Sequence, residues 1–200
     1  GIFFAPSSFS SSYSLTVAEA TFADNLAYSH GGGIYAYYLR DIDVTQNIFQ
    51  GNEAGYVSSS STRSAYGGGL YVGYTTSGAT NHDIANNNFC GNEAQYGGGL
   101  YLTSMSSVLD FSNNAIQSNI ARSYGGGLYA QSLSYPDLIN NSFVGNAASS
   151  NGGGLYVTNS RLDFINNIVA YQRGGHGIYG DSTAASYGTF RYNNWYSNAT

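Results

Sequence analysis

The sequence predicts an all-β fold, a parallel β-helix (β-solenoid) of about seven coils with three short strands per coil. Two observations carry this prediction. A motif recurs every 26 or 27 residues apart from one insertion, and apolar residues within each copy alternate with polar ones. Gly triplets and paired asparagines recur with the motif and disfavour helix. Short strands separated by Gly and Asn corners at a fixed period therefore indicate stacked coils.

Each copy of the motif has two halves. In the first half, a glycine is followed by Ile-Tyr or Leu-Tyr, at Gly33, Gly69, Gly99, Gly127, Gly154 and Gly177. In the second half, an apolar residue precedes Asn by three positions, at Phe22/Asn25, Phe49/Asn52, Phe89/Asn92, Ile116/Asn119, Phe143/Asn146 and Trp195/Asn198. Val169/Gln172 is the weakest copy. One coil cannot bury its inner face alone, so equivalent positions are predicted to stack into columns. A further Asn column is expected at a corner, because Asn tolerates left-handed φ, at Asn47, Asn87, Asn114, Asn141, Asn167 and Asn193.

Alternation with period two assigns the faces of the strands. In "LDFSN", Leu109 and Phe111 share the inner face while Asp110 points outward. The same register predicts an outward row of carboxylates at Asp43, Asp83, Asp110, Asp137 and Asp163. A solvated row is the simpler interpretation, because unit charges ~5 Å apart in water repel by only ~0.8 kcal/mol. A calcium-bridged ladder at Asp110, Asp137 and Asp163 is the alternative, since stacked carboxylates offer oxygen ligands, and no other cofactor is expected.

The repeat also sets the domain boundaries. Residues 1–18 lack the motif and are predicted to form a strand-like N-terminal extension. Residues 19–200 are predicted to form the solenoid, with "GYVSSSSTRSAY" at 55–66 inserted as a polar loop.

Composition excludes several function classes. Charged residues make up 8% of the chain, the formal net charge is −5, and all six cationic side chains are Arg. A chain without a basic patch is a poor partner for nucleic acid or an anionic membrane, and no segment is long and apolar enough to predict a transmembrane span. Cys90 is the single cysteine, so no intrachain disulfide can form.

At "GGGLY…NNSFVGNAA" the chain resembles the repeats of polymorphic outer-membrane proteins, a GGA-[IL] plus FxxN pattern of bacterial autotransporter passenger domains. It is also similar to right-handed parallel β-helix repeats of the pectin-lyase-like fold. The resemblance implies a right-handed single-stranded solenoid in a secreted, extracellular or cell-surface protein, commonly an adhesin or a structural element. Unlike that pattern, this chain often has Gly where the family has Ala.

The tripeptide Gly175-His176-Gly177 resembles the GHG tripeptide of polygalacturonases. Those enzymes also use an adjacent Asp pair and an Arg-x-Lys clamp, and this chain has neither Asp-Asp nor Lys. His176 lies in the Gly-triplet position of its repeat, so we expect a corner residue and assign no catalytic residue. A carbohydrate-active enzyme, either a polysaccharide lyase or a hydrolase, is the alternative.

Outward-facing tyrosines are predicted to stack into an aromatic strip at Tyr35, Tyr71, Tyr101, Tyr129, Tyr156 and Tyr179. Stabilisation of the wall is the simpler role, and binding of sugar rings is the alternative, which would make the chain a monomeric glycan-binding passenger segment. Two sequons predict candidate glycosylation sites at Asn140 and Asn198.

The two ends of the rod are expected to present open coil edges, because the sequence shows no capping element. The final coil, with Trp195 in the Phe position, could stack beneath the first coil, with Phe22. Head-to-tail stacking of this kind does not close and builds filaments. We expect copies of the chain to be the partners, with contacts in Gly1–Ala5 and Phe190–Thr200, above all at Gly1, Ile2, Phe3, Phe4, Phe22 and Trp195. The sequence thus predicts a non-enzymatic structural or adhesive surface filament.

Overall fold

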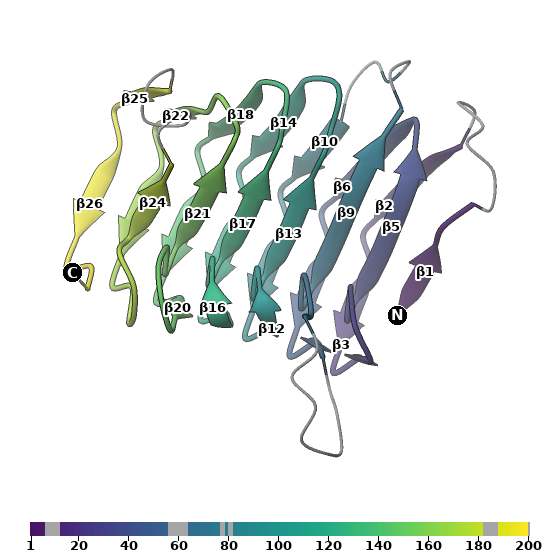
Figure 1. Cartoon of the computed structure of the whole chain (residues 1–200), viewed down its shortest axis with the longest axis horizontal. Coiled ribbons are helices and arrows are strands. Elements are labelled where there is room, and N and C mark those ends of the chain that lie inside the picture. The colour runs from purple at the N-terminus through teal and green to yellow at the C-terminus, as the bar shows by residue number, and fades with distance from the viewer. Residues whose placement is uncertain (7–12, 56–63, 77–78, 80–81, 182–187, 200) are drawn as a thin grey trace.

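The computed structural model describes residues 1–6, 13–55, 64–76, 79, 82–181 and 188–199. Within these ranges the chain is all-β, and every paired strand runs parallel to its neighbours. The chain winds as a right-handed β-solenoid, with the N- and C-termini at opposite ends of the rod (Figure 1). None of the described residues forms a helix with the length and apolar character needed to cross a membrane.

Three sheets run the length of the rod, and each has seven strands among the described residues. Sheet A contains β1 (Ile2–Phe4), β5 (Ile34–Leu39), β9 (Leu70–Thr75), β13 (Leu100–Thr103), β17 (Leu128–Gln131), β21 (Leu155–Thr158) and β24 (Ile178–Gly180). Sheet B contains β2 (Ser14–Ala18), β6 (Asp41–Thr45), β10 (His82–Ala85), β14 (Leu109–Ser112), β18 (Pro136–Ile139), β22 (Asp163–Ile165) and β25 (Thr189–Arg191). Sheet C contains β3 (Thr21–Ala23), β7 (Ile48–Gln50), β11 (Asn88–Cys90), β15 (Ala115–Gln117), β19 (Ser142–Val144), β23 (Ile168–Ala170) and β26 (Asn194–Tyr196).

A fourth, narrower sheet follows sheet C in the first five coils. The prediction of three strands per coil did not include it. Sheet D contains β4 (Leu26–Ala27), β8 (Glu53–Ala54), β12 (Glu93–Tyr96), β16 (Ile120–Tyr124) and β20 (Ala147–Ala148). Three of its strands have only two residues, too few to show the alternation from which strands are predicted. The number of strands per coil is therefore three to four, whereas the predicted parallel solenoid is confirmed.

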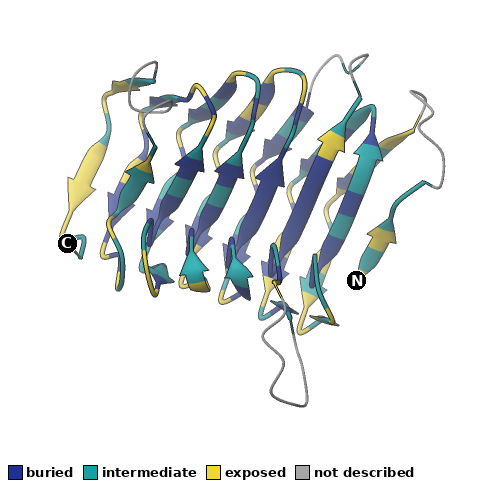
Figure 2. Cartoon of the chain, in the orientation of Figure 1, coloured by how far each residue is buried: buried dark blue, intermediate teal, exposed yellow. Residues whose placement is uncertain are grey.

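The core is a set of vertical columns, as predicted. Leu70, Leu100, Leu128 and Leu155 are consecutive partners in sheet A and are fully buried. Phe rings stack in sheet C, where the centroids of Phe49 and Phe89 lie 4.6 Å apart. Figure 2 shows the buried strands of the middle coils between more exposed strands at the two ends. Burial of these columns is the main term that stabilises the rod.

The Asn columns close the corners between sheets. Asn114 is buried and joins its own coil to the two neighbouring coils: its side-chain amide donates to the Ile84 carbonyl and to Asn141 Oδ1, and its Oδ1 accepts from the Asn87 N–H. Gln172 fills the second column where Asn is missing, and its Oε1 accepts from the Asn146 N–H at 2.9 Å. The columns thus satisfy corner backbone groups that sheet pairing leaves unpaired.

The Gly triplets are required where the corner before sheet A packs on the next coil. Gly97 has a φ of 64°, and a Cβ at Gly98 would lie 2.4 Å from the Ile120 carbonyl oxygen. A side chain at Gly98 would clash with backbone, which cannot move aside.

Residues 1–18 were predicted to form a strand-like extension, and the described parts of this segment contribute two strands to the sheets of the solenoid. β1 is the edge strand of sheet A and pairs with β5, and β2 pairs with β6. The N-terminal ammonium donates to Asn25 Oδ1 at 2.7 Å, which fixes the start of the chain to the first coil. The segment lacks Gly and Asn corners but keeps the alternating apolar residues that sheet pairing needs. Of the loop predicted at 55–66, residues 56–63 lie outside the described residues.

Candidate functional site

The outward tyrosines of sheet A stack as predicted. Ring centroids along the column lie 4.8–5.5 Å apart, in the order Phe3, Tyr35, Tyr71, Tyr101, Tyr129, Tyr156 and Tyr179. Tyr71 and Tyr101 are only 7% and 6% exposed although they point away from the core. Burial raises the pKa of both phenols above the ordinary value of tyrosine.

A second aromatic column, which the sequence analysis missed, lies beside the first. It contains His30, Tyr66, Tyr96 and Tyr124, each immediately before a Gly triplet. The rings of Tyr66 and Tyr96 meet the first column edge to face, as in the Tyr66–Tyr101 pair at 4.7 Å, whereas the His30 ring stacks on Tyr71. The recurrent pattern "YGGG" was the sequence signal for it.

The two columns together restrict what the aromatic strip can bind. Each inner ring has both faces covered by the rings above and below it, so only ring edges and hydroxyl groups reach the surface. A sugar that stacks on tyrosine needs a free ring face, and the inner rings of the column do not offer one. The arrangement favours the stabilising role of the strip.

The predicted carboxylate row is in register across sheet B, with Asp83 between Asp43 and Asp110, and Asp137 between Asp110 and Asp163. Asp110 is exposed, whereas the other four are half-buried. Burial, together with the neighbouring carboxylates, raises the pKa of Asp83 and Asp137. Asp43, Asp83 and Asp163 each have one buried carboxylate oxygen without a hydrogen-bond partner. The described residues contain no group of three His, Cys, Asp or Glu arranged to hold a metal ion.

Side chains of the types that bind transition metals come from different parts of the repeat. Cys90 is half-buried on the outer face of sheet C, between Gln50 and Gln117. Met105 is part of the core, and His82 is buried between Ile42 and Leu109 on the inner face of sheet B. Burial lowers the pKa of His82, and neither ring nitrogen has a hydrogen-bond partner.

His176 lies at a corner, as predicted. Gly175 before it has a φ of 68°, like the first glycine of the other triplets, and the His176 carbonyl accepts from the Gly153 N–H at 2.7 Å. The ring is exposed, and its Nδ1 lies 3.3 Å from Asn151 Oδ1. The partner of the ring is therefore an amide and not a carboxylate.

The two sequon asparagines differ in accessibility. Asn140 is exposed in a left-handed corner with a φ of 59°. The Asn198 amide donates to the Val169 carbonyl at 2.8 Å within the second Asn column. A glycan on Asn198 would require that hydrogen bond to break, so Asn140 is the better acceptor in the folded chain.

The predicted assembly residues lie on the two end coils. Phe3 is 77% exposed at the N-terminal end, while Ile2, Phe4 and Phe22 are half-buried against the first core layer. Trp195 is 47% exposed at the C-terminal end, in the same column of sheet C as Phe22. Among the described residues, each end thus presents exposed aromatic side chains and the free edges of sheets A, B and C.

The chain matches a protein family over most of its first five coils. The model of the family described as "Periplasmic copper-binding protein (NosD)" matches residues 7–149, more than half of the chain. A search of curated proteins and a search of solved structures each found no match.

Proposed function

The chain belongs to the family described as periplasmic copper-binding protein (NosD), and we propose that it is a non-enzymatic structural β-solenoid outside the cytoplasm that stacks head to tail. The family description supports a location in the periplasm or elsewhere in the cell envelope. A surface adhesin, as in the autotransporter passengers that the repeat resembles, is the finer form of the same proposal.

Copper binding does not carry over to this chain from the family description. Copper sites in proteins use thiolate, thioether and imidazole ligands held close together. Here Cys90 is on the outer face of sheet C, His82 is on the inner face of sheet B, and Met105 is in the core after β13. The described residues include no metal-holding group of His, Cys, Asp or Glu. The residues present do not fit a copper ion, and the proposal uses none.

The observation that carries the proposal is the match between the two end coils. All paired strands are parallel, so the free edge of β24, β25 and β26 in one copy can pair with β1, β2 and β3 of the next copy in the same direction. Phe22 stacks on Phe49 with a centroid distance of 5.0 Å and is the first residue of this column among the described strands of sheet C. Trp195 is at the other end of that column. Stacking would continue both the hydrogen-bond ladders and the aromatic columns across the junction.

Single substitutions can block each end without removing a hydrogen bond inside the chain. The Ile2 N–H donates to the Gly33 carbonyl, so the backbone of Phe3 points to the free edge of β1. Likewise the Asn194 N–H donates to the Asn167 carbonyl, and the backbone of Trp195 points to the free edge of β26. Phe3→Pro and Trp195→Pro therefore remove one intermolecular donor each, and proline also blocks strand addition sterically.

The test is sedimentation velocity over a concentration series. Wild type is expected to form linear assemblies that lengthen with concentration, whereas Phe3→Pro and Trp195→Pro alone stay monomeric. An equimolar mixture of the two variants should give dimers and nothing larger, because one free head meets one free tail. Tyr135→Ala, an exposed position away from both ends, is the matched control and should assemble like wild type. A wild-type chain that stays monomeric at all concentrations, or variants that still dimerise alone, would contradict head-to-tail stacking.

The proposal assigns no catalytic step. His176, the residue that resembles an enzyme motif, contacts Asn151 and takes the place of Gly153 of the preceding coil. These contacts support a corner role. Replacing His176 with Ala should leave the turnover of pectic and other polysaccharides by this chain unchanged, and a loss of turnover in a folded variant would favour the enzyme alternative.

A further inference from the structure

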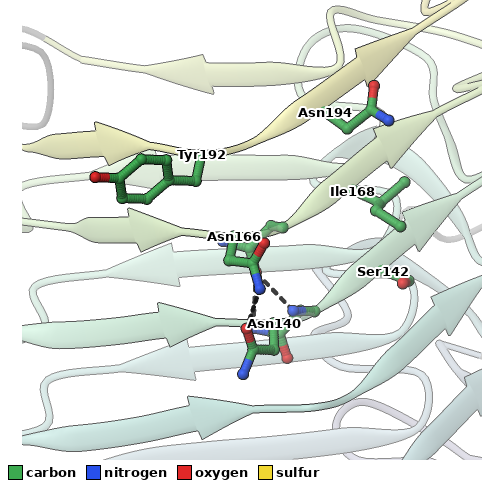
Figure 3. A pocket seen from close by; sticks show the side chains of 8 residues that line it. Asn140, Ser142, Asn166, Ile168, Tyr192 and Asn194 are labelled. Atoms are coloured by element: carbon green, nitrogen blue, oxygen red, sulfur yellow. Dashed lines mark hydrogen bonds between the residues drawn. The ribbon is translucent and has the colours of Figure 1, made fainter.

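A polar groove lies on the outer surface at the corner between sheets B and C, near the C-terminal end of the rod (Figure 3). Its volume is about 530 Å³, within the range of ~300–1,000 Å³ that is usual for small-molecule sites. The lining comes from three successive coils and consists of Asn140, Asn141, Ser142, Asn166, Asn167, Ile168, Tyr192 and Asn194.

The groove displays side-chain amides in a fixed arrangement. Asn140, Asn166 and Tyr192 occupy the same left-handed corner of successive coils, with φ angles of 59°, 55° and 57°. This conformation directs their side chains away from the core, and the Asn166 amide donates to Asn140 Oδ1 at 2.6 Å. Asn141 and Asn167 belong instead to the inner column, so the exposed polar groups of the groove come from the corner residues, Ser142 and Asn194.

Tyr192 gives the groove an accessible aromatic ring. The residue is 83% exposed, in contrast to Tyr71 and Tyr101 in the aromatic column. Ile168 is also partly exposed and adds an apolar patch beside the amides. The groove thus combines hydrogen-bonding groups with a ring face and an aliphatic side chain.

The chemistry of the lining narrows the class of ligand. No lining residue is charged, so the groove lacks the cations that would hold a phosphate or carboxylate and the carboxylates that would hold an amine. Added peptide strands need a free sheet edge. Here β23 lies between β19 and β26 inside sheet C, and its backbone is already paired. Amides that pair with neighbouring hydroxyl groups, beside a ring that packs on C–H groups, fit a sugar.

We propose that this groove binds a neutral oligosaccharide, with Tyr192 as the stacking residue and Asn140 and Asn166 as the main hydrogen-bonding residues. Successive coils are ~4.8 Å apart, so the three corner residues form a line along the rod that one short saccharide can follow. Tyr192 and Asn194 belong to the last coil, beside the edge that head-to-tail stacking would cover, so binding is measured on the monomeric chain.

The experiment is isothermal titration of the monomeric chain with cellohexaose, maltohexaose and chitohexaose, and with hexagalacturonate as a charged comparison. At least one neutral hexasaccharide is expected to bind, and more tightly than hexagalacturonate. Tyr192→Asn should weaken this binding about tenfold or more, because it removes the stacking of the sugar on the tyrosine ring. The substitution places in this corner the residue that preceding coils use there, so the variant is expected to fold. Asn166→Gly, which keeps the left-handed backbone accessible, should weaken binding by a smaller factor.

Two matched variants control for changes outside the groove. Tyr171→Asn is the control for Tyr192→Asn, because Tyr171 is another exposed tyrosine with a left-handed backbone. Asn113→Gly is the control for Asn166→Gly, because Asn113 occupies the equivalent corner of a coil outside the groove. Both should bind like wild type. The proposal is overturned if none of the neutral hexasaccharides binds, if hexagalacturonate binds as tightly, or if Tyr192→Asn binds as well as Tyr171→Asn.

Discussion

Replacing Asn119 with Ala tests whether the buried Asn columns hold the coils together. Asn119 is fully buried at the corner between sheets C and D. Its Oδ1 accepts from the backbone N–H and the side-chain amide of Asn92, both at 2.9 Å. Its own amide donates to the Phe89 carbonyl at 2.9 Å and to Asn146 Oδ1 at 3.0 Å. One side chain therefore joins three coils.

The size of the effect follows from these four hydrogen bonds. Each contributes about 0.5–1.5 kcal/mol to the free energy of unfolding, so their loss costs about 2–6 kcal/mol. The Asn92 N–H would also lose its acceptor in a site that water does not reach, which places the cost in the upper part of that range. Asn119→Ala should therefore destabilise the chain by about 3–6 kcal/mol.

Urea unfolding measures this difference. Circular dichroism follows the whole solenoid, and the fluorescence of Trp195, the single tryptophan, follows the last coil. Coincident transitions justify a two-state free energy. Gln117→Ala is the matched control, because Gln117 is an exposed residue on the adjacent strand, and it should cost less than about 0.5 kcal/mol. If Asn119→Ala costs no more than Gln117→Ala, the columns do not contribute as argued.

Three further substitutions test other columns. Leu128→Ala should lower the free energy of unfolding by about 2–5 kcal/mol, since the side chain is fully buried, and a loss below 1 kcal/mol in urea unfolding would contradict that burial. Asp83→Asn should stabilise the chain at pH 7 by a few tenths of a kcal/mol to ~1 kcal/mol. The folded-state pKa of Asp83 is raised, so the wild-type chain loses stability as pH rises from about 3.8 through that pKa. Thermal melts should therefore show Asp83→Asn to be more stable than wild type at pH 7 and not at pH 3. His82→Leu should stabilise by about 1–3 kcal/mol by removing two unpartnered ring nitrogens. Because the folded-state pKa of His82 is lowered, wild type should lose stability as pH falls below about 6.5 while the variant loses less; equal acid sensitivity would refute this assignment.

The repeat made most of the fold predictable from the sequence. Equivalent positions in successive coils must be partners in a parallel sheet, so the columns of Leu128, Asn114 and Asp110 follow directly from the spacing. The direction of each side chain follows from alternation, which places Leu109 inside and Asp110 outside. The strands predicted from local sequence agree with the fold because every coil packs equivalent residues against the same columns.

Two parts of the fold were not predictable by the same argument. Sheet D has strands such as Glu53–Ala54, which are too short for alternation to appear. Residues 1–18 lack the motif, and Ile2–Phe4 joins sheet A because its backbone pairs with β5, which needs no particular side chain.

The candidate sites were harder to predict than the fold. The burial of Tyr71 depends on rings from neighbouring coils and from the second column, and a single strand shows neither. The groove at Tyr192 depends on three coils meeting at one corner, where each residue alone resembles an ordinary turn residue. The spacing of the repeat is enough to predict which residues stack in a column. The exposure of a side chain depends also on the residues of neighbouring columns and coils.

Electron microscopy of the concentrated wild-type chain shows whether this solenoid stacks end to end. Seven coils at ~4.8 Å predict an axial subunit repeat of about 34 Å in unbranched filaments. Head-to-tail stacking predicts filaments with that repeat in wild type. It predicts no filaments in Phe3→Pro or Trp195→Pro. Single rods about 34 Å long at every concentration, or assemblies joined side by side, would contradict it.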